Sequence, residues 1–165
     1  MMTERRFDLM ISIGNLPDSS FIAIPLAELH YDLFVSPEYL NTIGENVTEE
    51  EVLTKYNIAI QELANNTHCW PHDELPLKRL PRFVVESPDL LTDYVKEGMA
   101  IGCLPLPLAM PEVKAGRLRL MFEGKYRFPM TVYAVYHSRR YVPAKVKLLI
   151  EELKGKMQVA INQYS

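Results

Sequence analysis

Short apolar runs alternate with helix start signals along this chain of 165 residues. Residues 9–13 are apolar at nearly every position, as in a strand covered on both faces, and Gly14 ends the run with a turn. Ser36-Pro37 and Ser87-Pro88 each place a hydroxyl cap before a proline whose φ suits the first helical position. Strands that alternate with helices in this way predict an α/β fold.

The first half of the chain contains one segment that fits two periods. Residues 21–26 and 28–35 are expected as two extended runs, and the helix after Pro37 is expected to stop near Gly44. Thr48 and Glu51 have capping-box spacing and predict a further helix start. Residues 52–63 then carry apolar side chains at helical spacing, yet residues 57–61 alternate as a strand does, so the residues alone leave both possibilities open.

Prolines and glycines divide the second half. Residues 83–85, 100–104, 118–122 and 131–136 are expected as strands, with a loop over 71–81 and helices after Pro88 and after Pro143. Gly98 is expected to close the first of these helices. Pro105, Pro107 and Pro111 predict that no regular element continues beyond the strand 100–104.

Charge and hydropathy exclude several classes of protein. A net charge of -3 and a pI near 5.8 leave no excess of positive charge for a phosphate backbone, so this chain alone is not expected to bind DNA. No secretory signal pattern is present, and the nearly apolar run 99–110 is shorter than the roughly 20 residues that a membrane span needs. Cys69 and Cys103 lie in unlike sequence surroundings and predict no disulfide framework. The sequence therefore predicts a cytoplasmic protein without a membrane segment.

Three turns and strand ends are candidate binding positions. Ligands of open α/β sheets bind beyond the carboxyl ends of strands, and helix N-termini attract anions. The residues at these places are Ser12, Ile13, Gly14, Asn15, Glu86, Ser87, Pro88, Cys103, Leu104 and Pro105. On the residues alone, the favoured interpretation is that Ser87 is only a cap and Cys103 only core.

The sequence gives little indication of metal binding or catalysis. His68, Cys69 and His72 lie close together, but a zinc site needs about four ligands and no fourth stands at a recognisable spacing, so a surface loop is expected. The sequence has no nucleophile elbow, P-loop or dinucleotide fingerprint, and therefore predicts neither an enzyme nor a cofactor. Arg139-Arg140 with Lys145 and Lys147 is the one basic cluster, and a nucleic-acid role is its weaker interpretation.

Three segments resemble the effector-binding domain of LysR-type transcriptional regulators, in that family's order. They are FDLMISIGNLPDSS at 7–20, YVKEGMAIGCLP at 94–105 and VYAVYHSRRYVPAKV at 132–146. The resemblance implies a periplasmic-binding-protein-like (type 2) fold of two lobes, with 1–30 and 132–165 as an incomplete first lobe and 31–131 as the second lobe. For residues 52–63 it favours a helix that ends near Tyr56, followed by a strand. A truncated domain is expected, because the family's helix-turn-helix and the first part of its effector domain have no counterpart here.

The resemblance also implies a function. Domains of this family sense a small-molecule effector in a cleft between the lobes and regulate transcription through a DNA-binding head. The strand ends would line that cleft. The resemblance therefore favours a binding role for Ser87 and Cys103 over a purely structural one. The branch of the family that the chain most resembles usually has an arginine at the position that Ser12 occupies here. A serine can donate a hydrogen bond but brings no charge, so an anionic ligand held by an arginine is not expected at this position. The alternative is a free-standing small-molecule-binding module of the same fold.

A homodimer or higher oligomer is expected as well. In the family, the strand that resembles residues 9–13 lies in a sheet built largely from the preceding segment, so its edge and faces would be uncovered here. Uncovered edges and apolar patches recruit another chain. The expected surface consists of 9–13, 132–136 and the stripe Val146, Leu149, Ile150 and Leu153.

Overall fold

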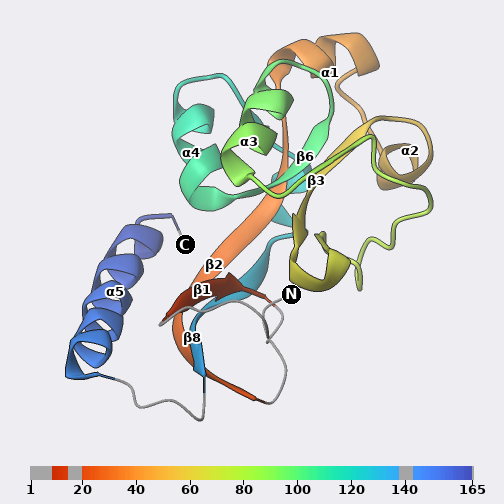
Figure 1. Ribbon diagram of the computed structural model, residues 1–165. Helices are drawn as coiled ribbons and strands as arrows, with labels where there is room; N and C mark the ends of the chain where they lie inside the picture. The colour runs from red at the N-terminus through yellow and green to blue at the C-terminus, as the bar shows by residue number, and fades with distance from the viewer. Residues whose placement is uncertain (1–8, 15–19, 138–142, 165) are drawn as a thin grey trace. The chain divides into compact units, whose positions relative to one another are not determined.

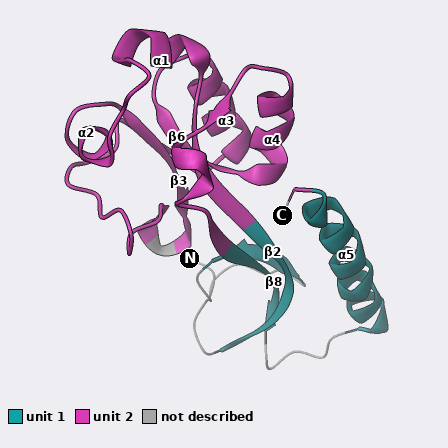
Figure 2. Ribbon diagram, turned by 180° about the vertical axis from the view of Figure 1, so that it is seen from behind, with its two compact units in different colours: residues 1–29, 130–163, 165 teal, residues 30–129, 164 magenta. Residues whose placement is uncertain are grey.

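The computed structural model describes residues 9–14, 20–137 and 143–164. They form two compact units, which are considered one at a time (Figure 2). Within the described part, unit 1 consists of the residues up to Leu29 together with Met130–Gln163. Unit 2 consists of His30–Pro129 and Tyr164. Strands β2 (Phe21–Val35) and β8 (Phe128–His137) each contribute residues to both units.

Helices and strands are mixed along the chain, which confirms the predicted α/β class (Figure 1). The other strands are β1 (Met10–Ile13), β3 (Ile58–Leu63), β4 (Thr67–Cys69), β5 (Phe83–Val85), β6 (Ile101–Pro105) and β7 (Arg119–Leu120). The helices are α1 (Pro37–Ile43), α2 (Glu49–Thr54), α3 (Pro88–Lys96), α4 (Leu106–Lys114) and α5 (Ala144–Asn162). The strand order is β1-β8-β2-β6-β3-β4, with β5 paired to β3 and β7 paired to β2. Strand β3 runs parallel to β5 and β6, whereas β1 with β8 and β2 with β6 are antiparallel pairs.

The caps expected from the sequence start three helices of unit 2. Ser36 Oγ accepts a hydrogen bond from Tyr39 N at 3.1 Å at the start of α1, and Ser87 Oγ accepts one from Leu90 N at 3.2 Å at the start of α3. A proline follows each serine. Gly44, with a φ of 98°, ends α1 in a conformation that a side chain rarely adopts. Both predicted helix starts are confirmed.

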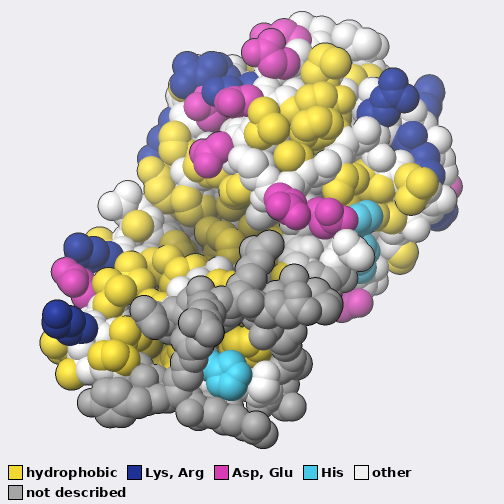
Figure 3. Space-filling view, in the orientation of Figure 1, with side chains coloured by type: hydrophobic (Ala, Val, Ile, Leu, Met, Phe, Trp, Pro, Cys, Tyr) yellow, Lys and Arg dark blue, Asp and Glu magenta, His cyan; other side chains and the backbone are white. Residues whose placement is uncertain are grey.

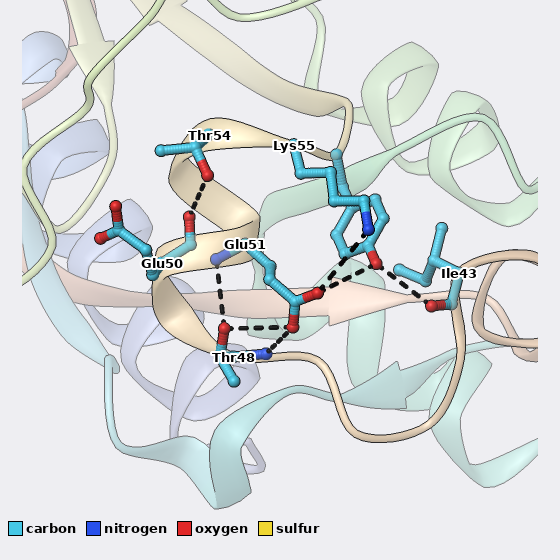
Figure 4. Close-up of polar contacts among 7 residues, drawn as sticks. Ile43, Thr48, Glu50, Glu51, Thr54 and Lys55 are labelled. Carbon is cyan, nitrogen blue, oxygen red and sulfur yellow. Dashed lines mark hydrogen bonds and ion pairs between the residues drawn. The ribbon is translucent and has the colours of Figure 1, made fainter.

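Helix α2 begins with the predicted capping box (Figure 4). Glu51 N donates to Thr48 Oγ1 at 3.2 Å, and Thr48 N donates to Glu51 Oε1 at 3.1 Å. The hydroxyl of Tyr56 bonds the other Glu51 oxygen and the carbonyl of Ile43. These bonds, chiefly those from Thr48, hold the pKa of Glu51 below its ordinary value. The chain then enters β3 at Ile58, so the helix followed by a strand that the resemblance favoured is confirmed.

The core of unit 2 lies between its sheet and helices α3 and α4. Phe34 and Leu104 from the sheet pack with Leu91 and Val95 from α3 and with buried residues of α4. Gly102 of β6 permits this packing, because a Cβ there would lie 2.3 Å from Val95 Cγ2. The close approach of helix and strand therefore requires a glycine at this position.

Unit 1 has a smaller core. Strand β1 pairs with β8 in the register Met10 with Val135 and Ile13 with Val132. Leu26 of β2, Val132 and Ala134 of β8 and Ile150 of α5 form the buried cluster. Helix α5 thus lays one face on the strands of its own unit.

Three sequence predictions are wrong. Residues 21–26 and 28–35 form one strand of 15 residues, because Ala27 between them does not break an extended chain. The strand expected over 118–122 is only β7, since Phe122 and Glu123 adopt positive φ values of 50° and 55° and lead into a short 3₁₀ turn.

The third error concerns the prolines after β6, where helix α4 forms instead of an irregular segment. Pro105 precedes the helix, and Pro107 lies in its first turn, where a backbone N–H has no intrahelical partner to lose. Pro111 lies inside the helix, yet the helix continues, because Leu106 and Ala109 are buried in the core of unit 2. Among the described residues, no helix has the length and apolar character that crossing a membrane requires.

Candidate binding site

The carboxyl ends of β3, β5 and β6 lie at one edge of the sheet in unit 2. These strands are mutually parallel, with Ile60 paired to Val84 and Ile58 to Ile101. Helix α3 follows β5, and α4 follows β6 directly. The N-termini of two helices therefore follow strands that end at the same edge.

The candidates from β6 are buried, whereas those from the start of α3 reach solvent. Cys103 and Leu104 have no exposed surface, and Pro105 precedes α4 without donating or accepting a side-chain cap. Glu86 and Ser87 are exposed, and the Ser87 hydroxyl caps α3. Pro88 is the first residue of that helix. Unit 2 thus brings these two groups of candidates to one sheet edge, although they differ in access.

The remaining candidates belong to unit 1. Ser12 pairs with Tyr133, and Ile13 pairs with Val132. Gly14, with a φ of 81°, donates its N–H to the carbonyl of Thr131 at 2.9 Å. Asn15 lies outside the described residues.

A buried polar pair near the same edge of unit 2 was missed by the sequence analysis. The hydroxyl of Tyr31 donates to Gln61 Oε1 at 2.9 Å, and both side chains are buried. Tyr31 stands opposite Pro105 in the register of β2 with β6, and Phe128 stacks on its ring at 5.8 Å. Burial raises the pKa of Tyr31, so the phenol is neutral and can donate. The signal in the sequence was a glutamine directly after the apolar run Ile58–Ile60.

Cys69 and Cys103 are neighbours in the fold although their sequence surroundings differ, and neither forms a disulfide. Both are free and buried, and the Cys69 thiol lies beside both Cys103 and Tyr31. Burial raises the pKa of Cys103, with a further contribution from Cys69. Both observations favour packing over reactivity for these thiols, because the thiolate is the reactive form.

Asp32 of β2 is a buried carboxylate that the sequence analysis also missed. Its oxygens accept from Leu33 N at 2.8 Å and from Arg127 Nε at 3.0 Å. Burial raises the pKa of Asp32, and the two hydrogen bonds oppose that rise. The pair ties β2 to the residue that precedes β8.

The segment of His68 and His72 gives no sign of a metal site. His72 Nε2 lies 3.0 Å from the carbonyl oxygen of His68, and Cys69 is buried among other partners. No group of three ligating side chains is arranged for a metal ion within the part of the chain that the structure describes. Of the predicted basic cluster, Arg139 and Arg140 lie outside the described residues.

The fold and the sheet edge define an α/β domain of the ligand-binding class, in which helix N-termini follow the ends of parallel strands. The sequence profile of the LysR substrate binding domain matches residues 1–158. The chain belongs to this family, the effector-binding domains of LysR-type transcriptional regulators, as its sequence predicted.

Individual relatives agree with this assignment. An HTH-type transcriptional regulator of Xanthomonas campestris is 27% identical over 155 residues, covering 88% of this chain and 44% of the relative. The HTH-type transcriptional activator AaeR of Escherichia coli is 25% identical over 162 residues, covering 88% of this chain and 48% of the activator. The chain thus spans about half the length of these curated relatives.

Solved structures agree on the fold. The regulatory domain of CrgA from Neisseria meningitidis superposes with a TM-score of 0.72 at 25% identity and covers 93% of this chain and 77% of that domain. The regulatory domain of HypT from Salmonella typhimurium, in a bromide-bound structure, gives a TM-score of 0.68 at 18% identity over 90% of this chain and 73% of that one. The periplasmic-binding-protein-like fold expected from the sequence is confirmed.

Proposed function

We propose that this chain senses a small-molecule effector and takes part in transcription regulation in the cytoplasm, with a binding role and no catalytic one. The observation that carries the proposal is the edge of unit 2 where β3, β5 and β6 end and where α3 and α4 begin. Membership of the LysR substrate binding domain family supports the same role.

The proposed contacts are the strand ends of both units. Ser12 to Asn15 from unit 1 and Glu86 to Pro88 with Cys103 to Pro105 from unit 2 would hold the effector. Ser87 Oγ accepts from Leu90 N but keeps its own proton to donate, and backbone N–H groups at the start of α4 have no side-chain cap. These donors suit a ligand with hydrogen-bond acceptors. In this proposal the two units are the two lobes of the effector domain.

A ligand screen tests the proposal. A panel of small organic acids, amino acids and aromatic metabolites is added to the purified chain, and binders are detected as a rise in the unfolding temperature. Backbone amide chemical shifts are then followed by NMR. Expected shifts include residues 12–14, 86, 87, 103, 104 and 106. Shifts confined to His68–His72 would show that the site is elsewhere, and the absence of any binder in an exhaustive panel would speak against sensing.

A pair of hydroxyl deletions sharpens the test. Tyr31→Phe removes the hydroxyl bonded to Gln61 beside Pro105, whereas Tyr126→Phe removes a hydroxyl bonded to Glu49 of α2 at 2.7 Å. We expect the first change to alter effector affinity and the second to leave it unchanged. Equal effects of the two changes would contradict a site at the strand ends.

A free-standing binding module is the second candidate, because it would use the same strand ends without a regulator. Reading the genomic DNA upstream of this coding sequence separates the two. A helix-turn-helix reading frame there supports the regulator, and an unrelated gene supports the module. In either case we propose that the chain assembles as a homodimer or higher oligomer.

A further inference from the structure

The side chain of Gln61 is buried, yet it carries hydrogen-bond donors that the fold does not use. It is only 4% exposed, and its Oε1 accepts from the hydroxyl of Tyr31 at 2.9 Å. The same amide group has two N–H donors on Nε2. These make no hydrogen bond within the described part of the chain, where the one fully buried side-chain nitrogen or oxygen without a partner is Nδ1 of His30. The amide nitrogen of Gln61 therefore reaches solvent with both donors available.

The strand registers place this amide between the strand ends that lead to α3 and α4. Gln61 pairs with Val85, the last residue of β5. Its partner Tyr31 pairs with Pro105, the last residue of β6. The hydrogen bond between them holds the amide with its oxygen toward the Tyr31 hydroxyl, so the nitrogen faces away from that hydroxyl. A fixed donor at the carboxyl edge of the sheet lies where α/β sheets bind ligands.

The groups around this amide favour an acceptor without charge. The first turn of α4 adds backbone N–H groups that no side chain caps. Glu86 follows β5, Asp89 lies in the first turn of α3, and both are exposed. The positive charge of Arg127 is engaged with the buried Asp32 at 3.0 Å. On the face of unit 2 that Figure 3 shows, acidic side chains likewise lie among hydrophobic ones. An anion would therefore be repelled by two carboxylates, whereas an uncharged acceptor would not.

Aromatic surface lies beside the amide. The ring of Phe128 stacks on that of Tyr31, with the centroids 5.8 Å apart and the planes at 17°. Phe128 is half-buried, so part of its ring remains accessible. Stacked rings next to a donor suit a ligand that joins a flat apolar group to a hydrogen-bond acceptor.

We propose that Gln61 selects the effector, and that the effector is an uncharged compound with a carbonyl oxygen, such as an amide, that accepts from Gln61 Nε2. Tyr31 is then a positioning residue, because its hydroxyl holds the oxygen of the amide. A carboxylate could accept from the same donors, but its charge would lose water near Glu86 without gaining a cation. This inference rests on the proposed function and names the chemical class of the ligand.

Three probes of nearly the same shape test the selection. Benzoate, benzamide and benzamidine carry a negative charge, no charge and a positive charge on the same ring. Each is titrated into the ¹⁵N-labelled full chain at about pH 8, where an ordinary carboxylate is ionised. NMR follows the side-chain NH2 signals of Gln61 and the backbone amides of residues 103, 104 and 106. We expect benzamide to shift these signals and to bind about tenfold more tightly than either charged probe.

Substitutions of Gln61 separate selection from a structural role. Gln61→Glu keeps an acceptor for Tyr31 but replaces the donor by an oxygen, so the preference should pass from benzamide to benzamidine by about tenfold or more. Gln61→Met removes the donor without adding charge, and should weaken benzamide binding by about tenfold with no gain for benzamidine. Asn57→Asp is the matched control, because it makes the same change from amide to carboxylate just before β3, and it should leave the order of the probes unchanged.

The outcomes distinguish this inference from the proposed function. Tightest binding of benzoate, or an order of probes that survives both substitutions of Gln61, would overturn selection by Gln61 while binding at the strand ends still supported sensing. If neither the probes nor the wider ligand panel bind, both proposals fall. Should the Gln61 variants not fold, Tyr31→Phe replaces them, because it releases the amide and should weaken benzamide binding. Unchanged benzamide binding by Tyr31→Phe would then contradict the inference.

Discussion

Asp32 has no solvent exposure, yet it carries an ionisable group between β2 and Arg127. Removal from water is the largest influence on its pKa and exceeds the opposing effect of the two hydrogen bonds. The Arg127 side chain is about a third exposed, and can take up water if it loses its partner. At this position burial thus favours the protonated acid in the folded state.

The pH dependence of stability follows from that direction. Since the folded pKa of Asp32 lies above the unfolded one, the folded state binds the proton more tightly, and stability falls as pH rises from the unfolded pKa through the folded pKa. Asp32→Asn keeps an acceptor for Leu33 N and removes the titration. We therefore expect the wild type to lose stability relative to Asp32→Asn over this acidic window, measured by urea unfolding at a series of pH values. Parallel curves for the two proteins would contradict the raised pKa.

At the scale of elements, local chemistry sets where helices begin. Ser87 Oγ accepts a hydrogen bond from Leu90 N at the start of α3, and this bond alone forms the cap. Ser87→Ala should lower the free energy of unfolding by about 1 kcal/mol, measured by urea denaturation. Ser87→Asn is the control, because asparagine caps equally well and should retain most of the stability. A full loss in both variants would mean that Ser87 acts through other contacts.

Helix α4 offers an internal comparison between two prolines. Pro111 lacks the N–H that would bond the carbonyl of Pro107, and an interior proline costs about 3 kcal/mol. Pro111→Ala should therefore stabilise the chain by about 1–2 kcal/mol, after the greater freedom of the unfolded chain is subtracted. Pro107→Ala should give no gain, because the first turn has no such bond to restore. Equal effects in chemical denaturation would contradict this account.

The contrast between α3 and α4 shows which features the sequence could predict. Ser36, Thr48 and Ser87 each accept from a backbone N–H three residues further on, so their caps depend on local sequence alone and were predicted. Helix α4 depends on the burial of Leu106 and Ala109 against distant strands, which a list of prolines does not reveal. The pair Tyr31 and Gln61 joins residues 30 positions apart, and only the strand order brings them together. The sequence therefore indicated the strand ends of the candidate site, but it did not indicate the buried pair Tyr31 and Gln61 beside them.

At the scale of the whole molecule, the net charge determines whether binding to nucleic acid is favoured. The net charge of -3 provides no counterion release on a phosphate backbone, so we expect no sequence-specific operator binding by this chain alone at physiological salt. Fluorescence anisotropy with labelled duplexes measures this. A dissociation constant below about 1 μM for one duplex over scrambled controls would contradict the expectation.

The order of residues in the two units has a consequence for synthesis on the ribosome. Apart from Tyr164, unit 2 is one continuous stretch, His30–Pro129, whereas unit 1 joins the beginning of the chain to its end. Domains fold as their sequences emerge, so unit 2 can complete its core before α5 has left the ribosome. Strand β1, although made first, must wait for residues 132–135 of β8 before it gains the partner seen here. Until β8 emerges, the nascent chain therefore displays unit 2 beside an unpaired β1, whose open backbone groups can recruit another chain.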